Sequence, residues 1–131
     1  MPLSNKFLAF GSLSGMSAII FDALSSHGVS DKIGPPDLAF IQLAIDYQLY
    51  NSLCLLIIGV LCKMSSIPKS LTTLSGLLLA AGMLVFCGSL YVKGLFETEL
   101  ISYLTPLGGL LLILGWGCLF LASLSVALSR D

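Results

Sequence analysis

Two carboxylates stand inside otherwise apolar segments of the chain, and their types and positions could support chemistry. Asp22 lies near the end of the first apolar segment, and Asp46 lies near the start of the second. If the second segment crosses the hydrocarbon in the roughly 20 residues that end at Cys62, Asp46 lies about 5 Å inside the boundary. Asp22 is at a similar depth in the first segment, so both carboxylates are expected at one level of a membrane.

Other polar side chains are expected at this level, and together with the two carboxylates we call them the polar collar. Ionisable groups inside a membrane are costly, and they tend to mark proton relays, ion pathways or polar binding sites. One hypothesis for the collar is therefore a proton or ion relay, or a pocket for a small polar substrate that opens to the outside. The other predicted members are His27, Gln48, Asn51, Ser89, Tyr91 and Lys93.

A structural role is the preferred interpretation of the collar. In this alternative, Asp22 or Asp46 pairs with Lys93 or caps the fourth helix, and the network holds the helices in register. Both carboxylates are near the rim of the membrane, whereas transporters usually bind their substrates near its midplane. The depth of the collar therefore favours structure over transport.

No metal, cofactor or catalytic site is expected. His27 is the only histidine, and no cysteine or carboxylate stands at metal-ligand spacing, which disfavours a metal site and paired haem ligation. The four cysteines form no Cys-x-x-Cys pattern and are expected to pack as small apolar side chains. The sequence also lacks the motifs of rhomboid-like, aspartyl and zinc proteases. We therefore expect a non-enzymatic protein without a cofactor.

The segments that must position the collar are long and apolar. The chain has 131 residues, of which 56% are hydrophobic and 10% charged, and its mean hydropathy is +1.01. A composition of this kind requires lipid as the solvent, and backbone groups in lipid must be paired within each segment. The segments lack the alternation of barrel strands, so they are predicted to be helices. We predict an all-α, single-domain protein of residues 1–131, an antiparallel up-down bundle of four transmembrane helices at about 7–24, 38–62, 71–92 and 106–128.

Small residues indicate where helices approach each other. Gly11 and Gly15 form a Gly-x-x-x-Gly pattern, which lets another helix come close in lipid. We expect the partner helix to lie within the chain, with a second copy of the chain or another membrane protein as the alternative.

The start of the fourth helix has its own signature. Thr105 is predicted to be the N-cap, and Pro106 the first helical residue, where a missing N–H group costs nothing. Gly108 and Gly109 would leave the free N–H groups of this helix end open to other groups of the collar.

Aromatic residues give a second indication of depth. Tyr47, Tyr50, Tyr91 and Tyr103 fall at the level of the collar, as expected for a belt at the membrane surface. Trp116 lies about ten residues into the last segment, which is too deep for a belt. We expect it to pack in the core.

The distribution of Lys and Arg predicts the orientation. Positive residues favour the cytoplasmic side, so both termini are predicted to be cytoplasmic in a bacterial inner membrane. A cleaved signal peptide is the alternative for the first segment. The formal net charge of −1 leaves no basic patch for nucleic acid, so the lipid bilayer is the expected partner. The residues counted are Lys6, Lys63, Lys69 and Arg130 on the cytoplasmic side, against Lys32 and Lys93 outside.

Short motifs along the chain resemble a known family. They are Ser25-Ser26-His27-Gly28, Tyr47-Gln48-Leu49-Tyr50, Phe86-Cys87-Gly88-Ser89-Leu90-Tyr91, Leu104-Thr105-Pro106-Leu107-Gly108-Gly109 and Gly115-Trp116. From about Phe7 to Leu128, the chain resembles the YgdD-like proteins, small four-span inner-membrane proteins related to transmembrane protein 256. The resemblance implies this fold but no activity, because the family is one of unknown function. The family often has a second histidine where this chain has Asn51, so no mechanism with two imidazoles is expected.

Three functions remain open at this point. The leading hypothesis is a structural or interaction protein of the inner membrane, such as an accessory or assembly subunit. The first alternative is a small transporter or channel that uses Asp22 and Asp46. The second alternative is a lipid- or quinone-binding protein, for which the sequence shows no specific pocket. The apolar run from Leu53 to Leu61 predicts a dry cytoplasmic half, which argues against conduction.

Overall fold

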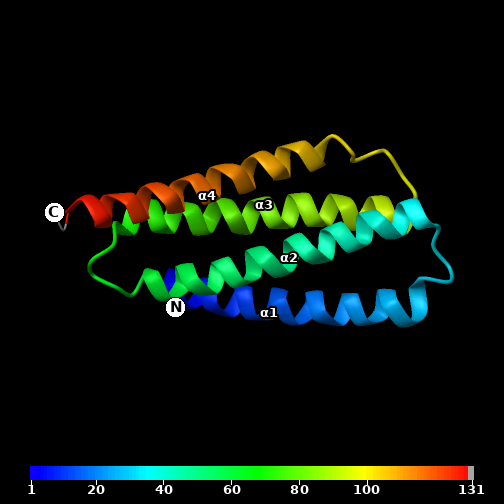
Figure 1. Ribbon diagram of the computed structural model, residues 1–131, viewed down its shortest axis with the longest axis horizontal. Helices are drawn as coiled ribbons and strands as arrows, with labels where there is room; N and C mark the ends of the chain where they lie inside the picture. The colour runs from blue at the N-terminus through cyan, green and yellow to red at the C-terminus, as the bar shows by residue number, and fades with distance from the viewer. Residues whose placement is uncertain (130–131) are drawn as a thin grey trace.

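Four long helices make up the computed structural model, which describes residues 1–129, with only the backbone at Val29. Each of them is long and apolar enough to cross a membrane, and residues 1–129 contain no strand, so the predicted fold class is confirmed. A short π-helical turn, η1, continues the first helix (Figure 1). The elements are α1 at Leu3–Leu24, η1 at Ser25–Val29, α2 at Pro35–Leu61, α3 at Lys69–Phe96 and α4 at Leu104–Ser129.

The helix boundaries follow from local chemistry, and each helix begins two to four residues before the predicted span. Pro35 starts α2, because a proline in the first turn lacks only an N–H group that would have no partner in the helix. α3 begins directly after Pro68 and ends before Glu97, whose φ of 49° is left-handed and terminates the helix. Arg130, which was counted for the orientation, lies outside the described residues.

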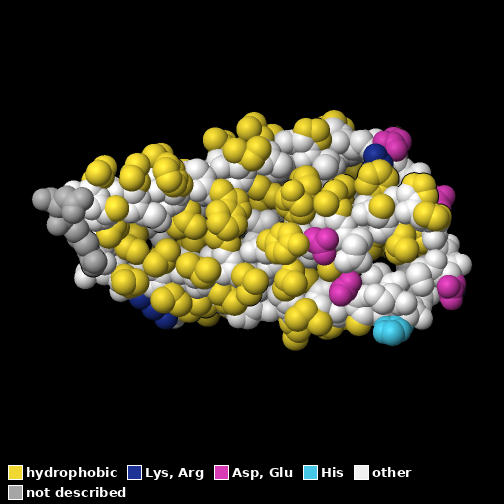
Figure 2. All heavy atoms as spheres, in the orientation of Figure 1, with side chains coloured by type: hydrophobic (Ala, Val, Ile, Leu, Met, Phe, Trp, Pro, Cys, Tyr) yellow, Lys and Arg dark blue, Asp and Glu magenta, His cyan; other side chains and the backbone are white. Residues whose placement is uncertain are grey.

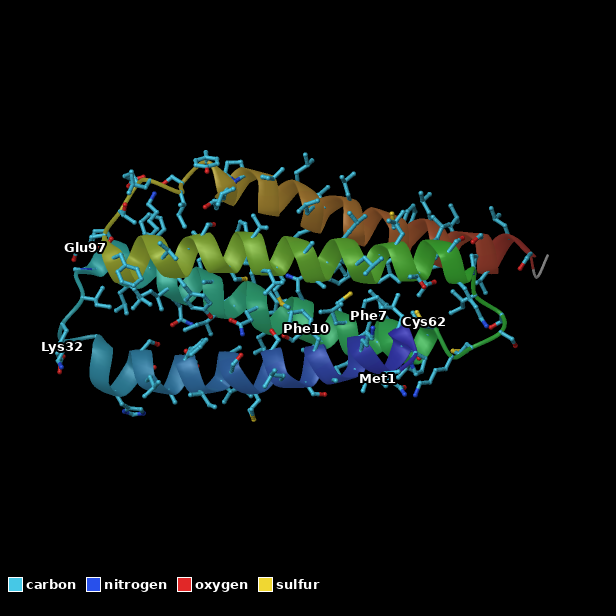
Figure 3. The ribbon with its side chains drawn as sticks, turned by 180° about the vertical axis from the view of Figure 1, so that it is seen from behind. Met1, Phe7, Phe10, Lys32, Cys62 and Glu97 are labelled. Atoms are coloured by element: carbon cyan, nitrogen blue, oxygen red, sulfur yellow. The ribbon has the colours of Figure 1, made fainter. Side chains whose placement is uncertain are left out.

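The helices form an antiparallel row in chain order, as Figure 1 shows. α1 packs along α2, α2 along α3, and α3 along α4, and no other pair of these helices packs along its length. α1 and α4 are therefore the outer members of the row. The start of α1, the α2–α3 loop and the end of α4 share one end of the molecule, and Lys32 and Glu97 lie at the other end (Figures 1 and 3).

Small residues seven positions apart bring α3 and α4 together. The hydroxyl of Ser75 donates a hydrogen bond to the carbonyl of Gly115 at 2.7 Å. A Cβ atom at Gly82 would lie 2.9 Å from the backbone nitrogen of Leu112, so only glycine allows this approach. Spacing of seven keeps one face of each helix on the shared seam. The buried small residues are Ser75, Gly82 and Ser89 on α3, and Gly108, Gly115 and Ala122 on α4.

The Gly-x-x-x-Gly pattern of Gly11 and Gly15 packs α1 against α2. A Cβ atom at Gly11 would lie 3.0 Å from the carbonyl oxygen of Ser52, and one at Gly15 would lie 3.6 Å from the Cβ of Ser52. Both glycines thus face α2 within the chain. Phe7 points from α1 toward the neighbouring helices (Figure 3) and its ring packs on Gly76 of α3.

The surface is apolar along the length of the helices. Figure 2 shows hydrophobic side chains over the visible flank, with charged groups mostly at the ends and two acidic groups set back from one end. The outer helices are the least buried, and Ile113 on α4 is 70% exposed. A surface of this kind is suited to lipid, and the protein is a membrane protein.

Candidate functional site

Asp22 and Asp46 are brought together by a residue that the sequence analysis missed. The amide nitrogen of Gln42 donates to Asp22 Oδ1 and to Asp46 Oδ1, each at 3.2 Å. Gln42 and Asp46 lie four residues apart on α2, so their side chains share one face of the helix. This spacing was the signal that could have identified Gln42. Asp22 is exposed and Asp46 is half-buried, so the bridged pair lies on the flank between α1 and α2.

Lys93 does not pair with either carboxylate, contrary to the expectation. Its ammonium group lies 3.3 Å from Glu99 Oε2 and 4.3 Å from the ring centre of Phe40. Lys93 is in the last turn of α3 and faces the start of α2 and the following loop, whereas the carboxylate pair lies on the α1–α2 flank. The predicted Asp–Lys ion pair is therefore wrong.

The loop after α3 is ordered by Glu99. Ser102 Oγ donates to Glu99 Oε2 at 2.6 Å, and Lys93 contacts the same oxygen. The hydrogen bond from Ser102, and next the hydrogen bond and charge of Lys93, hold the pKa of the Glu99 carboxyl below its ordinary value. The loop therefore carries a charged anchor at neutral pH.

Gln48 is the centre of the buried part of the collar. Its amide nitrogen donates to the carbonyl of Ser14 at 2.9 Å and to Ser17 Oγ at 2.8 Å. Its amide oxygen accepts a hydrogen bond of 2.6 Å from the hydroxyl of Tyr91. The ring of Phe21 packs edge-on against Tyr91 at 5.4 Å. One side chain therefore connects α1, α2 and α3, and Tyr91 belongs to this network rather than to an exposed belt.

Asn51 connects α2 to α4 through Trp116. The indole N–H of Trp116 donates to Asn51 Oδ1 at 3.2 Å, and the Asn51 amide donates to the carbonyl of Tyr47 at 2.8 Å. Trp116 is 49% exposed, so the expectation that it packs in the core is wrong. Its neighbour Gly115 packs on Leu79 of α3, and the next position on the helix therefore lies at the edge of the interface.

Ser89 binds the beginning of α4. Its hydroxyl lies 2.6 Å from the hydroxyl of Thr105 and donates to the carbonyl of Phe86. α4 begins at Leu104, so Thr105 is not the N-cap and Pro106 is the third helical residue rather than the first. The backbone turns already in the preceding residues, as the Leu104 N–H to Ile101 carbonyl bond of 3.0 Å indicates, and this moves the helix start back.

The two glycines of the first turns of α4 have different surroundings. Gly108 is buried against the backbone of Phe86, so it does not open the helix end to the collar as expected. A Cβ atom at Gly109 would lie 3.8 Å from the ring of Phe86, which is an ordinary contact. Gly108 therefore serves close packing, and Gly109 lines a groove.

His27 stands apart from the rest of the collar. It lies in η1, and the cyan group in Figure 2 shows that this histidine protrudes from the surface. Its side chain makes no hydrogen bond or ion pair with the residues that the structure describes. His27 therefore makes no contact with Asp22 or Asp46 among the described residues, and the structure shows no hydrogen-bonded path for a proton between them.

The half of the molecule that contains the termini has a mostly apolar core. Leu55, Ile58 and Leu79 are fully buried there, and Phe7 packs on Gly76. Thr72 and Ser75 are also fully buried, and their hydroxyl groups donate to the backbone carbonyls of Pro68 and Gly115. Within residues 1–129 no group of three metal-ligating side chains occurs. Apart from His27 and Lys93, the members of the collar form four separate polar contacts. They are the Gln42-bridged pair, the Gln48 network, the Asn51–Trp116 bond and the Ser89–Thr105 bond.

Comparison with known proteins places the chain among small membrane proteins. The family model described as "Protein of unknown function (DUF423)" matches residues 21–109, which include every predicted member of the collar. A UPF0382 membrane protein of Staphylococcus aureus is 37% identical over 121 residues, which are 92% of this chain and 97% of that protein. The UPF0382 membrane protein YwdK of Bacillus subtilis is 31% identical over 110 residues, 84% of this chain and 89% of that protein. No solved structure matches. The resemblance to a small membrane-protein family of unknown function is confirmed.

Proposed function

The chain belongs to the DUF423 family of proteins of unknown function, and from that premise we propose that it is a non-enzymatic structural or accessory protein of the bacterial inner membrane. In this role it offers lipid-facing helices to other membrane proteins and does not move a solute. Both termini lie in the cytoplasm, because Lys6, Lys63 and Lys69 lie at the same end of the molecule.

The observation that supports this proposal is that the buried Gln48 network is satisfied within the chain. The amide nitrogen of Gln48 donates to Ser14 and Ser17, and its amide oxygen accepts from Tyr91. Apolar side chains fill the neighbouring core. A transport pathway needs polar groups that can exchange partners with a moving ion or substrate. A network that is already paired instead holds helices in register.

Photo-crosslinking in growing cells tests the accessory role. A photoreactive residue at Phe120, which is 64% exposed on α4, should give an adduct with a membrane protein of defined mass. The matched site is Leu112 on the same helix, which is buried against α3 and should give no such adduct. Adducts with lipid alone at Phe120, or equal protein adducts at both sites, would count against the proposal.

A small transporter is the second candidate, and the Gln42 bridge is the observation in its favour. Two carboxylates share one amide, and neither has a cation partner among the described residues. Purified protein in vesicles with an internal pH dye should show no proton flux above empty vesicles if our proposal is right. The variants Asp22→Asn and Asp46→Asn keep an acceptor for Gln42 and should each lose about 1 kcal/mol of stability or less. A flux that both variants abolish without loss of stability would establish the transporter instead.

A further inference from the structure

A groove between α2 and α4 is the feature that the proposed function does not use. The two helices flank α3 without packing along each other, and this leaves an open cavity of about 430 Å³ over α3. The rings of Tyr47, Phe86 and Trp116 line it, together with Gly109 and Ile113. Tyr47 and Phe86 pack at 4.8 Å between ring centres, so two of the aromatic walls are in contact.

One buried amide side chain lines the groove. Asn51 lines it and is only 3% exposed, yet its amide nitrogen uses one hydrogen on the Tyr47 carbonyl and has a second to offer. The indole N–H of Trp116 donates to Asn51 Oδ1 at 3.2 Å, which is longer than the 2.8 Å bond from the Asn51 amide to the Tyr47 carbonyl. One N–H of the Asn51 amide is therefore left for a ligand in an aromatic-walled groove, beside an indole N–H that is bonded to the same amide.

The depth of the groove restricts what can enter it. Asn51 lies eight residues beyond Leu43, which is the first of the roughly 20 residues that end at Cys62 and cross the hydrocarbon. At 1.5 Å per residue, its amide is about 12 Å into the membrane. Water is scarce at that depth, so a ligand must dissolve in lipid and bring its own hydrogen-bond acceptor. An alkyl chain has no acceptor. A flat ring with carbonyl groups has one, and its faces match aromatic walls.

We propose that this groove binds a lipid-soluble ring that carries carbonyl acceptors, the chemistry of an isoprenoid quinone. A carbonyl of the ring accepts from the Asn51 amide, and the ring lies beside Trp116 and Tyr47. The volume is within the range of known small-molecule sites, which are mostly apolar with a few convergent polar groups. The proposal concerns binding, goes beyond the accessory role, and does not depend on it.

The single tryptophan of the chain reports on the groove directly. We would titrate the purified protein in detergent with a short-tailed naphthoquinone and follow the fluorescence of Trp116. Saturable quenching is expected for the wild-type protein. Gly109→Leu adds a side chain inside the groove and should weaken the apparent affinity at least about tenfold, which corresponds to about 1.4 kcal/mol. Gly117→Leu is the matched control, because Gly117 is on the same helix with open space around it and should bind like the wild type.

A second pair of variants protects the test against misfolding. If Gly109→Leu lowers the helix content, Ile113→Phe replaces it, because Ile113 lines the groove and is exposed. Leu114→Phe is the control, because Leu114 is exposed on the same helix but does not line the groove. Linear quenching that is equal in all proteins would overturn the proposal, because it reports only quinone dissolved in the micelle. Equal competition by farnesol, which has an isoprenoid tail but no ring, would also overturn it and assign the groove to a lipid chain.

Discussion

At the scale of single residues, the collar depends on amides rather than on charges. Gln48 joins three helices through one side chain, and Gln42 holds two carboxylates that have no cation partner among the described residues. Amides can donate and accept at once, so they can saturate a buried network without placing net charge in lipid. The residues most able to ionise in the spans are therefore at the flank, and the neutral ones are in the core.

The first prediction concerns Gln48 and Tyr91. Gln48→Leu leaves the buried hydroxyl of Tyr91 without its acceptor and should lower the free energy of unfolding by about 1–2 kcal/mol, with a similar loss for Tyr91→Phe. The double variant should lose less than the sum of the two, because both members of the hydrogen bond are then removed. Thermal unfolding in detergent measures this. Strict additivity would show that the hydrogen bond contributes nothing.

The second prediction concerns the pH response of the loop after α3. The pKa of Glu99 is lowered in the folded protein, so the stabilising contacts with Ser102 and Lys93 are complete above the ordinary carboxyl pKa of about 4.3. They are lost as the pH falls through the lower pKa of the folded protein. Hydrogen exchange at Leu100 to Leu104 should therefore accelerate below about pH 4, beyond the intrinsic pH effect. Glu99→Gln should show fast exchange already at pH 7, and identical exchange in both proteins would contradict the assignment.

At the scale of elements, glycine decides how closely the helices approach. α3 and α4 meet through small residues spaced by seven, and α1 meets α2 through Gly11 and Gly15. In lipid no hydrophobic effect drives helices together, so van der Waals contact between backbones must supply the attraction. A methyl group at the wrong position therefore costs more than its size suggests.

The third prediction uses two adjacent glycines of α4. Gly108→Ala places a methyl group against the backbone of Phe86, which cannot rotate away, and should cost about 1–3 kcal/mol. Gly109→Ala places the same group 3.8 Å from the Phe86 ring, and should be neutral or slightly stabilising because alanine favours the helix. Thermal unfolding of the two variants side by side tests the seam. Equal stability of both would mean that α4 packs differently.

The helices could be predicted from the sequence, and their rotations could not. Hydropathy and proline positions located all four spans within a few residues, because lipid imposes a length and forbids unpaired backbone groups. The partners of Lys93 and Trp116 depend on which way each helix faces, and near-uniform apolar segments carry little signal for that. The hydrogen bond between Gln42 and Asp46 could have been predicted, because residues four positions apart share one face of a helix.

At the scale of the whole molecule, the row of helices has two ends. α1 and α4 do not pack along each other, so the chain does not close into a ring of four mutually packed helices. α2 and α3 form the core, and the outer helices leave most of their surface to the membrane, as the apolar flank in Figure 2 illustrates. An open row of this kind provides both lipid-facing edges and the groove over α3.

The last prediction concerns the orientation of this row in the membrane. The four native cysteines, Cys54, Cys62, Cys87 and Cys118, would be replaced by alanine, and single cysteines placed at Gly34, Leu100 or Ser65. Gly34 and Leu100 are at the end that carries the collar, and Ser65 is in the loop beside the termini.

A membrane-impermeant maleimide added to intact cells should label Gly34→Cys and Leu100→Cys but label Ser65→Cys only after permeabilisation. The physical reason is that Lys63 and Lys69 flank Ser65, and positive loops stay in the cytoplasm during insertion. The opposite labelling would show that the orientation in the membrane is the reverse of the predicted one. The carboxylates and the groove would then lie in the cytoplasmic half of the membrane, and a quinone would reach the groove from the inner leaflet. The contacts within the chain would be unchanged.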